Sequence, residues 1–184
     1  MTNLCINRRR AGAAALAALL AVMVGCAATP DVRQDQDPSV DLRAYRTFSF
    51  VEFEADRGAS YAGLIGARLK AATRTQMERQ RYVYDEAQPD LLVRPYLVVQ
   101  ERQELRSSPT GRVARRGWSA YDIETVDYRQ GTIVVDLIDR RRGALVWHGV
   151  AEGRLDARAM DQPNQAIELA LSELFARFAD GHRL

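Results

Sequence analysis

The stretch GTIVVDLID at positions 131–139 is followed by RRRG at 140–143 and by LVWHGVAEGRL at 145–155. In the first run, apolar side chains alternate with the others, so one face of the segment is apolar. The segment RRRG that follows the first run ends in a glycine, which is typical of a tight turn. The stretch therefore predicts an antiparallel β-hairpin with one buried face.

A helix is expected after this hairpin. Asp161 and Pro163 are suited to a helix start, because proline fits the first helical turn, where its missing N–H has no intrahelical role. The apolar residues that follow recur at the three- and four-residue spacing of one helix face. They are Ile167, Ala170, Leu171, Leu174 and Phe178.

Strand patterns and one more helix precede the hairpin. Residues 46–53 and 91–99 are rich in β-branched and apolar side chains, and Pro95 places the second segment at a sheet edge or bulge. Ser60 is suited to cap a helix that runs to about Gln80. Its expected buried face consists of Tyr61, Leu64, Ile65, Leu69 and Ala72.

The segment 103–120 is polar and basic, and we expect it to form a long mobile loop before a strand over 121–128. The resulting order, β-α-β-β-β-β-α, bunches the strands in the middle of the chain. It predicts an α+β fold, a two-layer domain with a mostly antiparallel sheet and two helices on one face. This single domain is expected to span residues 41–180.

The first 25 residues are predicted to form a signal peptide. Three arginines at 8–10 precede an uncharged run from Ala11 to Val24, and small residues follow. An uncleaved transmembrane helix is the alternative, because about 18 uncharged residues reach the lower limit of a bilayer span. The run is rich in alanine rather than leucine, which favours the signal peptide.

The end of this segment, Met23-Val24-Gly25-Cys26, is similar to the lipobox of bacterial lipoproteins, although leucine is usual where Met23 stands. The resemblance implies cleavage before Cys26 and a lipid on its sulfur. Cys5 would leave with the signal, so the mature chain has no second thiol for a disulfide. By analogy with enterobacterial sorting, Ala27 after the cysteine points to the periplasmic face of the outer membrane.

Residues 26–40 are polar and contain two prolines, and we expect them to hold the lipidated cysteine and a flexible tether. Removal of residues 1–25 takes away three arginines and no acids, so the formal charge falls from +2 to −1. A nearly neutral exported protein is not suited to bind nucleic acid. A hydrophobic fraction of 47% excludes a disordered chain.

Four segments together resemble the domain of unknown function 4136 family of bacterial lipoproteins. They are the lipobox, DLRAYRTFSF at 41–50, PDLLV at 89–93, and the run from 131–139 into LVWHG at 145–149. The family usually has Arg-Gly after the tryptophan, where this chain has His148-Gly149, and often a C-terminal Phe-Pro, which is absent. The resemblance implies an envelope lipoprotein with an α+β domain and no established activity.

The sequence has no visible catalytic constellation, and we expect no catalytic residue, cofactor or metal. His148 lies on the strand face opposite Trp147 and within reach of Glu152, but an exposed strand histidine is the simpler interpretation. An acidic cluster lacks the glycine-containing loop that is typical of calcium sites. It consists of Asp122, Glu124 and Asp127.

The basic segment is the strongest candidate for an interaction. Between Arg102 and Trp118 five arginines stand against one acid, so a charge of +4 is concentrated there. Such a segment is suited to anionic lipid headgroups, an anionic glycan or an acidic envelope protein. A solvated loop without a partner is the alternative. The candidate contact residues are Arg112, Arg115, Arg116 and Trp118, with His148 on the sheet.

These observations favour a lipid-anchored cell-envelope lipoprotein that binds or scaffolds and is not an enzyme. Its partners would be the membrane, through the anchor, and an envelope protein, glycan or lipid. Two other classes remain open: a periplasmic cell-wall accessory hydrolase that uses carboxylates, and a carrier of a small molecule or lipid. Two carboxylates in a cleft would favour the hydrolase, and an apolar cavity between sheet and helices would favour the carrier.

Overall fold

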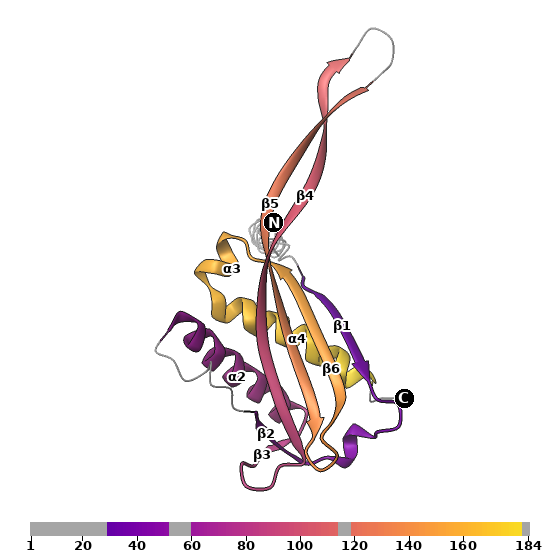
Figure 1. The fold of residues 1–184 in the computed structure, drawn as a ribbon, viewed down its shortest axis with the longest axis vertical. Coiled ribbons are helices and arrows are strands. Elements are labelled where there is room, and N and C mark those ends of the chain that lie inside the picture. The colour runs from indigo at the N-terminus through magenta and orange to yellow at the C-terminus, as the bar shows by residue number, and fades with distance from the viewer. Residues whose placement is uncertain (1–28, 52–59, 114–118, 182–184) are drawn as a thin grey trace, which may run out of the picture.

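A computed structural model describes residues 29–51, 60–113 and 119–181, with the side chains of 108–113, 119–122 and 179–181 left out. These residues form a two-layer α+β domain, in which a six-stranded sheet carries the helices on one face (Figure 1). The expected fold class is confirmed. The expected signal peptide and Cys26 lie outside the described residues.

The strand order across the sheet is β1-β6-β5-β4-β2-β3. Strands β1, β6, β5 and β4 are antiparallel neighbours, whereas β2 runs parallel to both β3 and β4. The parallel pairs follow from helix α2, because a strand needs a crossover connection to return in the same direction. The elements are β1 (Asp31–Gln36), the 3-10 turn η2 (Leu42–Ala44), β2 (Thr47–Phe50), α2 (Tyr61–Arg79), β3 (Val83–Tyr84), β4 (Leu91–Val113), β5 (Ser119–Asp139), β6 (Ala144–Arg154), α3 (Ala157–Asp161) and α4 (Pro163–Gly181).

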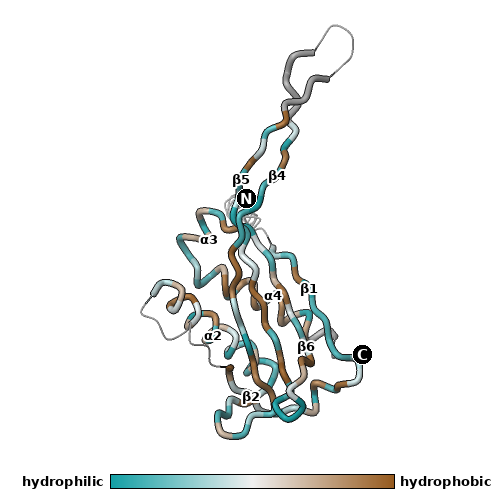
Figure 2. Tube along the Cα trace, in the orientation of Figure 1, coloured by the Kyte–Doolittle hydropathy of each residue, from teal (hydrophilic) through white to brown (hydrophobic). Residues whose placement is uncertain are grey.

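The core lies between the sheet and the long helices α2 and α4. Hydrophobic residues are concentrated along the strands in the body of the domain (Figure 2). Trp147 of β6 is fully buried and packs against Phe175 and Phe178 of α4. The predicted apolar face of α4 is confirmed, since four of its residues are buried and the fifth, Ala170, is partly buried against the core. The four are Ile167, Leu171, Leu174 and Phe178.

Helix α2 begins as expected but turns a different face inward. The Ser60 hydroxyl accepts a hydrogen bond from the N–H of Gly63 at 3.2 Å, which caps the helix. Ile65 and Leu69 are buried as predicted, but Tyr61 and Leu64 are exposed. The buried row repeats every four residues from Ile65, and Leu64 lies about 100° away from it on the helix surface.

The flexible tether expected over 26–40 is wrong from Asp31 onward. Residues Asp31–Gln36 form edge strand β1, which pairs antiparallel with β6. Val32 is buried in the core, and the Gln34 amide donates to the Arg177 carbonyl of α4 at 3.1 Å. The domain therefore begins ten residues earlier than expected. The sequence does not reveal this strand, because its single apolar residue gives no alternating pattern.

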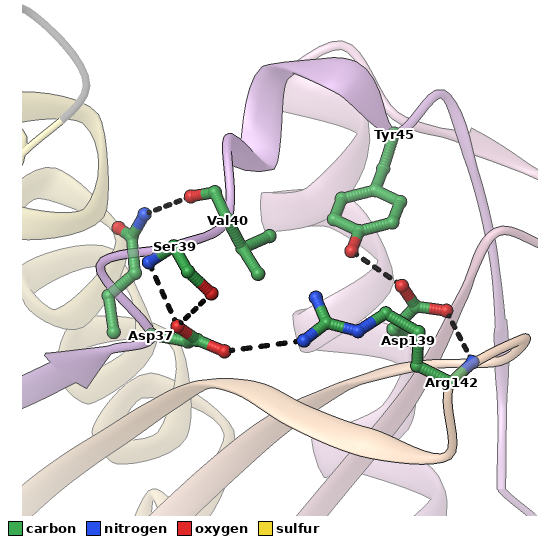
Figure 3. Close-up of polar contacts among 7 residues, drawn as sticks. Asp37, Ser39, Val40, Tyr45, Asp139 and Arg142 are labelled. Atoms are coloured by element: carbon green, nitrogen blue, oxygen red, sulfur yellow. Dashed lines mark hydrogen bonds and ion pairs between the residues drawn. The ribbon is translucent and has the colours of Figure 1, made fainter.

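Polar contacts close one end of the sheet, where the chain after β1 meets the β5–β6 turn (Figure 3). Arg142 of the turn pairs with Asp37 at 3.7 Å, and the Tyr45 hydroxyl donates to Asp139 Oδ2 at 2.8 Å. Asp139 Oδ1 also accepts the N–H groups of Arg141 and Arg142. These contacts fix the predicted hairpin turn, in which Gly143 takes the left-handed φ of 63°.

The opposite end of the sheet extends into a two-stranded arm, here called the ribbon. Strand β4 pairs with β2 only as far as Val93, and β5 pairs with β6 only as far as Gln130. Beyond these points β4 and β5 stay paired with each other, out to Val113 and Ser119. Residues 101–113 and 119–129 therefore project from the body (Figure 1) by roughly 40 Å.

The ribbon corrects two expectations. The prediction of a mobile loop over 103–120 is wrong for the described residues, which belong to β4 and β5. The segments 121–128 and 132–139, predicted as two strands, belong to the single strand β5. Both strands of an exposed ribbon are solvated on both faces, so neither needs the apolar alternation that marks a strand in the sequence. The sheet-edge position of Pro95 is confirmed, because the pairing of β4 with β2 ends two residues earlier, at Val93.

Candidate functional site

The sheet face that the helices leave uncovered contains a buried carboxylate. Asp136 of β5 is 1% exposed, although it alternates with core residues Val135 and Leu137 and so points to the uncovered face. Its direct cross-strand neighbours are Arg94 on β4 and His148 on β6. Three consecutive strands thus bring these three side chains together.

Both oxygens of Asp136 are occupied. The Nε and Nη2 atoms of Arg94 donate to Oδ2, the first at 3.0 Å, and Nδ1 of His148 lies 2.6 Å from Oδ1. Charge-assisted hydrogen bonds of this kind offset the cost of burying a carboxylate. Because Oδ1 accepts, a neutral His148 keeps its proton on Nδ1 and leaves Nε2 as an acceptor.

A shallow hollow of about 470 Å³ lies beside His148 on the same face. Its lining combines the apolar Val134 and Val150 with the hydroxyl-bearing Tyr96 and Thr132, and with charged residues of β1 and β6. It lies outside the sheet, not between the sheet and the helices, which is where a carrier cavity was expected.

The partner that the sequence suggested for His148 is wrong. Glu152 instead pairs with Arg33 of β1 and accepts a hydrogen bond from the Gln130 amide at 2.7 Å. Asp136 takes its place because it lies directly opposite His148 on the neighbouring strand, whereas Glu152 lies four residues along the same strand.

The arrangement offers one oriented imidazole nitrogen next to a small apolar patch. A histidine oriented by a buried carboxylate can exchange a proton or a hydrogen bond at Nε2. Among the described residues, no group of three His, Cys, Asp or Glu side chains could hold a metal ion. The chemistry that this face provides directly is recognition of a polar group beside an apolar one.

Arg154 of β6 fixes the base of the ribbon. Its guanidinium carbon lies 3.9 Å from the ring centroid of Tyr128 on β5, and the group pairs with Glu104 on β4. The hydrogen bond to Glu104 raises the pKa of Arg154. One side chain of the body therefore contacts both strands of the ribbon.

The register of the ribbon changes the interpretation of the basic segment. Arg106 lies opposite Glu124, and Glu101 lies opposite Arg129. Over 101–129 the sequence has six arginines and five acids, so the acids of β5 largely cancel the predicted excess of positive charge. The acidic cluster is divided as well, because Glu124 and Asp127 alternate onto opposite faces of β5.

The remaining predicted contact residues are at the tip of the ribbon. Arg112 lies on the described backbone of β4, but its side chain is outside the described part. Arg115, Arg116 and Trp118 lie wholly outside the described residues.

Sequence reasoning missed Arg94 and Asp136. Both are charged residues within strongly apolar runs, which is a usable signal, but only the strand register reveals that they meet.

The sequence pattern of the domain of unknown function 4136 family matches residues 32–178. The chain belongs to this family. The match starts inside β1 and ends in α4, so it includes the first and the last element of the described domain. It confirms the resemblance noted in the sequence. No curated protein matches the chain.

Two solved structures are similar to this family member. A PDZ domain protein from Parabacteroides distasonis has a TM-score of 0.55 at 11% identity, over 82% of this chain and 36% of that one. This chain thus spans about a third of that protein, and the likeness concerns the fold alone. A PelC dodecamer from Paraburkholderia phytofirmans has a TM-score of 0.44 at 15% identity, over 79% of this chain and 98% of that one, too low to support an argument. Among the described helices, none is both long and apolar enough to cross a bilayer.

Proposed function

We propose that this protein is a lipid-anchored cell-envelope lipoprotein, without catalysis, that binds or scaffolds other envelope components through its ribbon. Lipid attachment at Cys26 and a place at the periplasmic face of the outer membrane belong to this proposal. Its support comes from the lipobox-like Met23-Val24-Gly25-Cys26 and from the position of β1 in the fold.

The start of β1 is the observation that carries the proposal. Asp31 lies opposite Glu152 near the end of β6, at the same end of the sheet from which the ribbon departs (Figure 1). Four residues separate Cys26 from Asp31, so their Cα atoms are five steps apart and lie at most about 18 Å from each other when the segment is fully extended. A lipid on Cys26 would therefore keep the base of the ribbon close to the membrane surface.

The ribbon is the element best suited to contact a neighbour. It is roughly 40 Å long, about twice the reach of the segment that joins it to the anchor. Leu105 and Ile123, which lie diagonally across its two strands, are each 73% exposed. A two-stranded hairpin is only marginally stable in water, so a partner that covers these residues would stabilise it.

Lipid attachment is tested by metabolic labelling with radioactive palmitate. The wild-type chain is expected to take up label and to fractionate with membranes, because buried acyl chains make release negligible. The Cys26→Ser variant should remain unlabelled and unprocessed. Label on the Ser variant would overturn the assignment of the anchor.

Contact through the ribbon is tested in cells by a photo-crosslinking amino acid at Leu105 or at Ile123. The matched control position is Leu64, an exposed leucine on α2 in the body of the domain. Crosslinked envelope components are expected from the two ribbon positions and not from the control. Equal crosslinking at all three positions, or none, would contradict the proposed role of the ribbon.

A further inference from the structure

We propose that the partner of the ribbon is the ribbon of a second copy of this chain, joined edge to edge, with β5 of one copy antiparallel to β4 of the next. This inference rests on the proposed function in that the ribbon is the contact arm.

Both edges of the ribbon present unpaired backbone groups. The N–H of Val51 donates to the Val93 carbonyl, and the N–H of Leu155 donates to the Arg129 carbonyl. Odd-numbered residues of β4 and β5 therefore direct their backbone groups away from the other strand of the ribbon. Within the described residues, nothing pairs with these edges over 101–107 or 123–128. Such edges are templates for pairing with another chain.

Two prolines define a window on the β4 edge. Pro95 and Pro109 both stand at odd positions, so the missing N–H of each faces the open edge. From Leu97 to Ser107 every odd residue keeps its N–H on that edge. The edge is therefore blocked at both ends and left open over the stretch that contains the base of the ribbon.

Residues 102–107 of the window match the free edge 123–128 of β5 in another copy, in the register that the ribbon already uses. From Arg129 onward, Leu155 and β6 occupy the edge of β5. Inside the chain the even residues form the hydrogen-bonded pairs, so the odd residues would form them between copies, with side chains kept on matching faces. Each contact between copies would then repeat the opposite-charge pair Arg106 with Glu124. Glu101 and Arg129 stay outside the contact, because the Arg129 carbonyl already accepts the N–H of Leu155. Leu105 would gain Thr125 of the next copy as a second neighbour.

Pairing of β5 with β5 is disfavoured. It would bring Glu124 and Asp127 of both copies together, and like charges on adjacent strands are destabilising. Pairing of β5 with β4 uses two different edges, so it is heterologous and adds copies in a row or closes them into a ring. Because β4 and β5 run in opposite directions within each chain, antiparallel pairing of β5 with β4 of the next copy points both ribbons the same way. Copies anchored in one membrane share such an orientation.

The first test uses two differently tagged full-length chains in the same cell, one with Leu105→Cys and the other with Thr125→Cys. These positions face each other within one chain, so separate chains make any disulfide intermolecular. Hydrogen-bonded pairs have Cα atoms about 5.5 Å apart, within disulfide range. A disulfide between the two tags is expected, and neither variant alone should form one.

A dimer of the Thr125→Cys chain alone would indicate β5-to-β5 pairing and overturn the proposal. Absence of any disulfide between tags would also overturn it. If photo-crosslinks from Leu105 then capture a different envelope component, the proposed function stands without self-pairing. If those crosslinks are absent too, both proposals fail.

The second test separates the proposed register from chance proximity. A charge-swapped chain combines Arg106→Glu and Glu124→Arg, which keeps this cross-strand pair opposite in charge and removes only the exposed ion pair of Arg106 with Glu104. Swapped chains are expected to crosslink with each other as wild-type chains do. Crosslinking between a swapped chain and a wild-type chain should be several-fold weaker, because each mixed contact places like charges opposite each other. Equal crosslinking in the mixed sample would overturn the proposed register.

Discussion

The indole of Trp147 lies over Gly149, two residues further along β6, so closely that a Cβ at position 149 would be 2.1 Å from Cη2. The ring also packs edge-on against Phe178, with centroids 5.1 Å apart and an interplanar angle of 89°. Gly149 and Gly153 share the helix-facing side of β6 with Trp147, where small residues would let a helix approach the sheet. The structure instead assigns Gly149 to a side chain of its own strand, whereas a Cβ at position 153 would meet no atom within 4 Å beyond its chain neighbours.

The Gly149→Ala substitution is expected to destabilise the domain by about 1–3 kcal/mol, because the buried indole must shift in a packed core. Gly153→Ala is the matched control on the same face of the same strand, and its effect should stay within about 0.5 kcal/mol. Denaturant unfolding of the purified proteins measures both. Equal stability of the two variants would contradict the contact with Trp147.

Helix α4 should depend on its buried leucines. Leu171 and Leu174 have no exposed surface, so Leu171→Ala or Leu174→Ala should cost about 2–5 kcal/mol through lost burial and a residual cavity. Leu169, on the outer side of the same helix, is the control, and Leu169→Ala should cost far less. Thermal unfolding measures these effects. Equal melting temperatures for all three variants would show that α4 does not dock as described.

The sequence predicts the body of the fold because apolar periodicity records burial. The buried face of α4 and the buried face of the β5–β6 hairpin both follow from that signal. Strand β1 does not, because five of its six residues are polar and its place is set by pairing with β6. The ribbon also leaves no periodic signal, since neither face of it is covered by the domain.

The candidate site shows the same limit. His148 could be singled out as a histidine on an outward strand position, but its partner could not be. Asp136 becomes significant only when the register places Arg94 on one side of it and His148 on the other. A difference of one residue in the register would send the carboxylate to a different pair of neighbours.

Asp90 gives the fold an acid-sensitive contact. Its Oδ2 accepts the N–H groups of Arg46 at 2.8 Å and Thr47 at 3.1 Å, and the hydrogen bond from Arg46 is the main reason that the pKa of Asp90 lies below its usual range. As the pH falls, the unfolded chain therefore takes up this proton before the folded chain does. The stabilisation is complete above the pKa of the unfolded carboxyl and is lost as the pH falls through the folded pKa.

The Asp90→Asn variant should be less stable than the wild type at neutral pH, and the difference should shrink as the pH falls below about 4, the usual pKa of a free aspartate. The free energy of unfolding, measured with denaturant in steps from pH 6 to pH 3, checks this. Parallel profiles for the two proteins would show that Asp90 does not contribute to the acid response.

The last prediction concerns the coupling of His148 to Asp136. His148→Ala should destabilise the domain by about 1–3 kcal/mol, because it leaves Oδ1 of a buried carboxylate without its donor. Asp136→Ala should cost a similar amount, and less than the loss of a fully buried pair, because Arg94 is 38% exposed and can be hydrated. Once Asp136 is absent, the loss of His148 leaves no buried atom unsatisfied. The double variant should therefore be more stable than the sum of the single effects predicts, by about 1 kcal/mol. Denaturant unfolding of all four proteins measures this difference, and strictly additive effects would mean that the 2.6 Å contact contributes no stability.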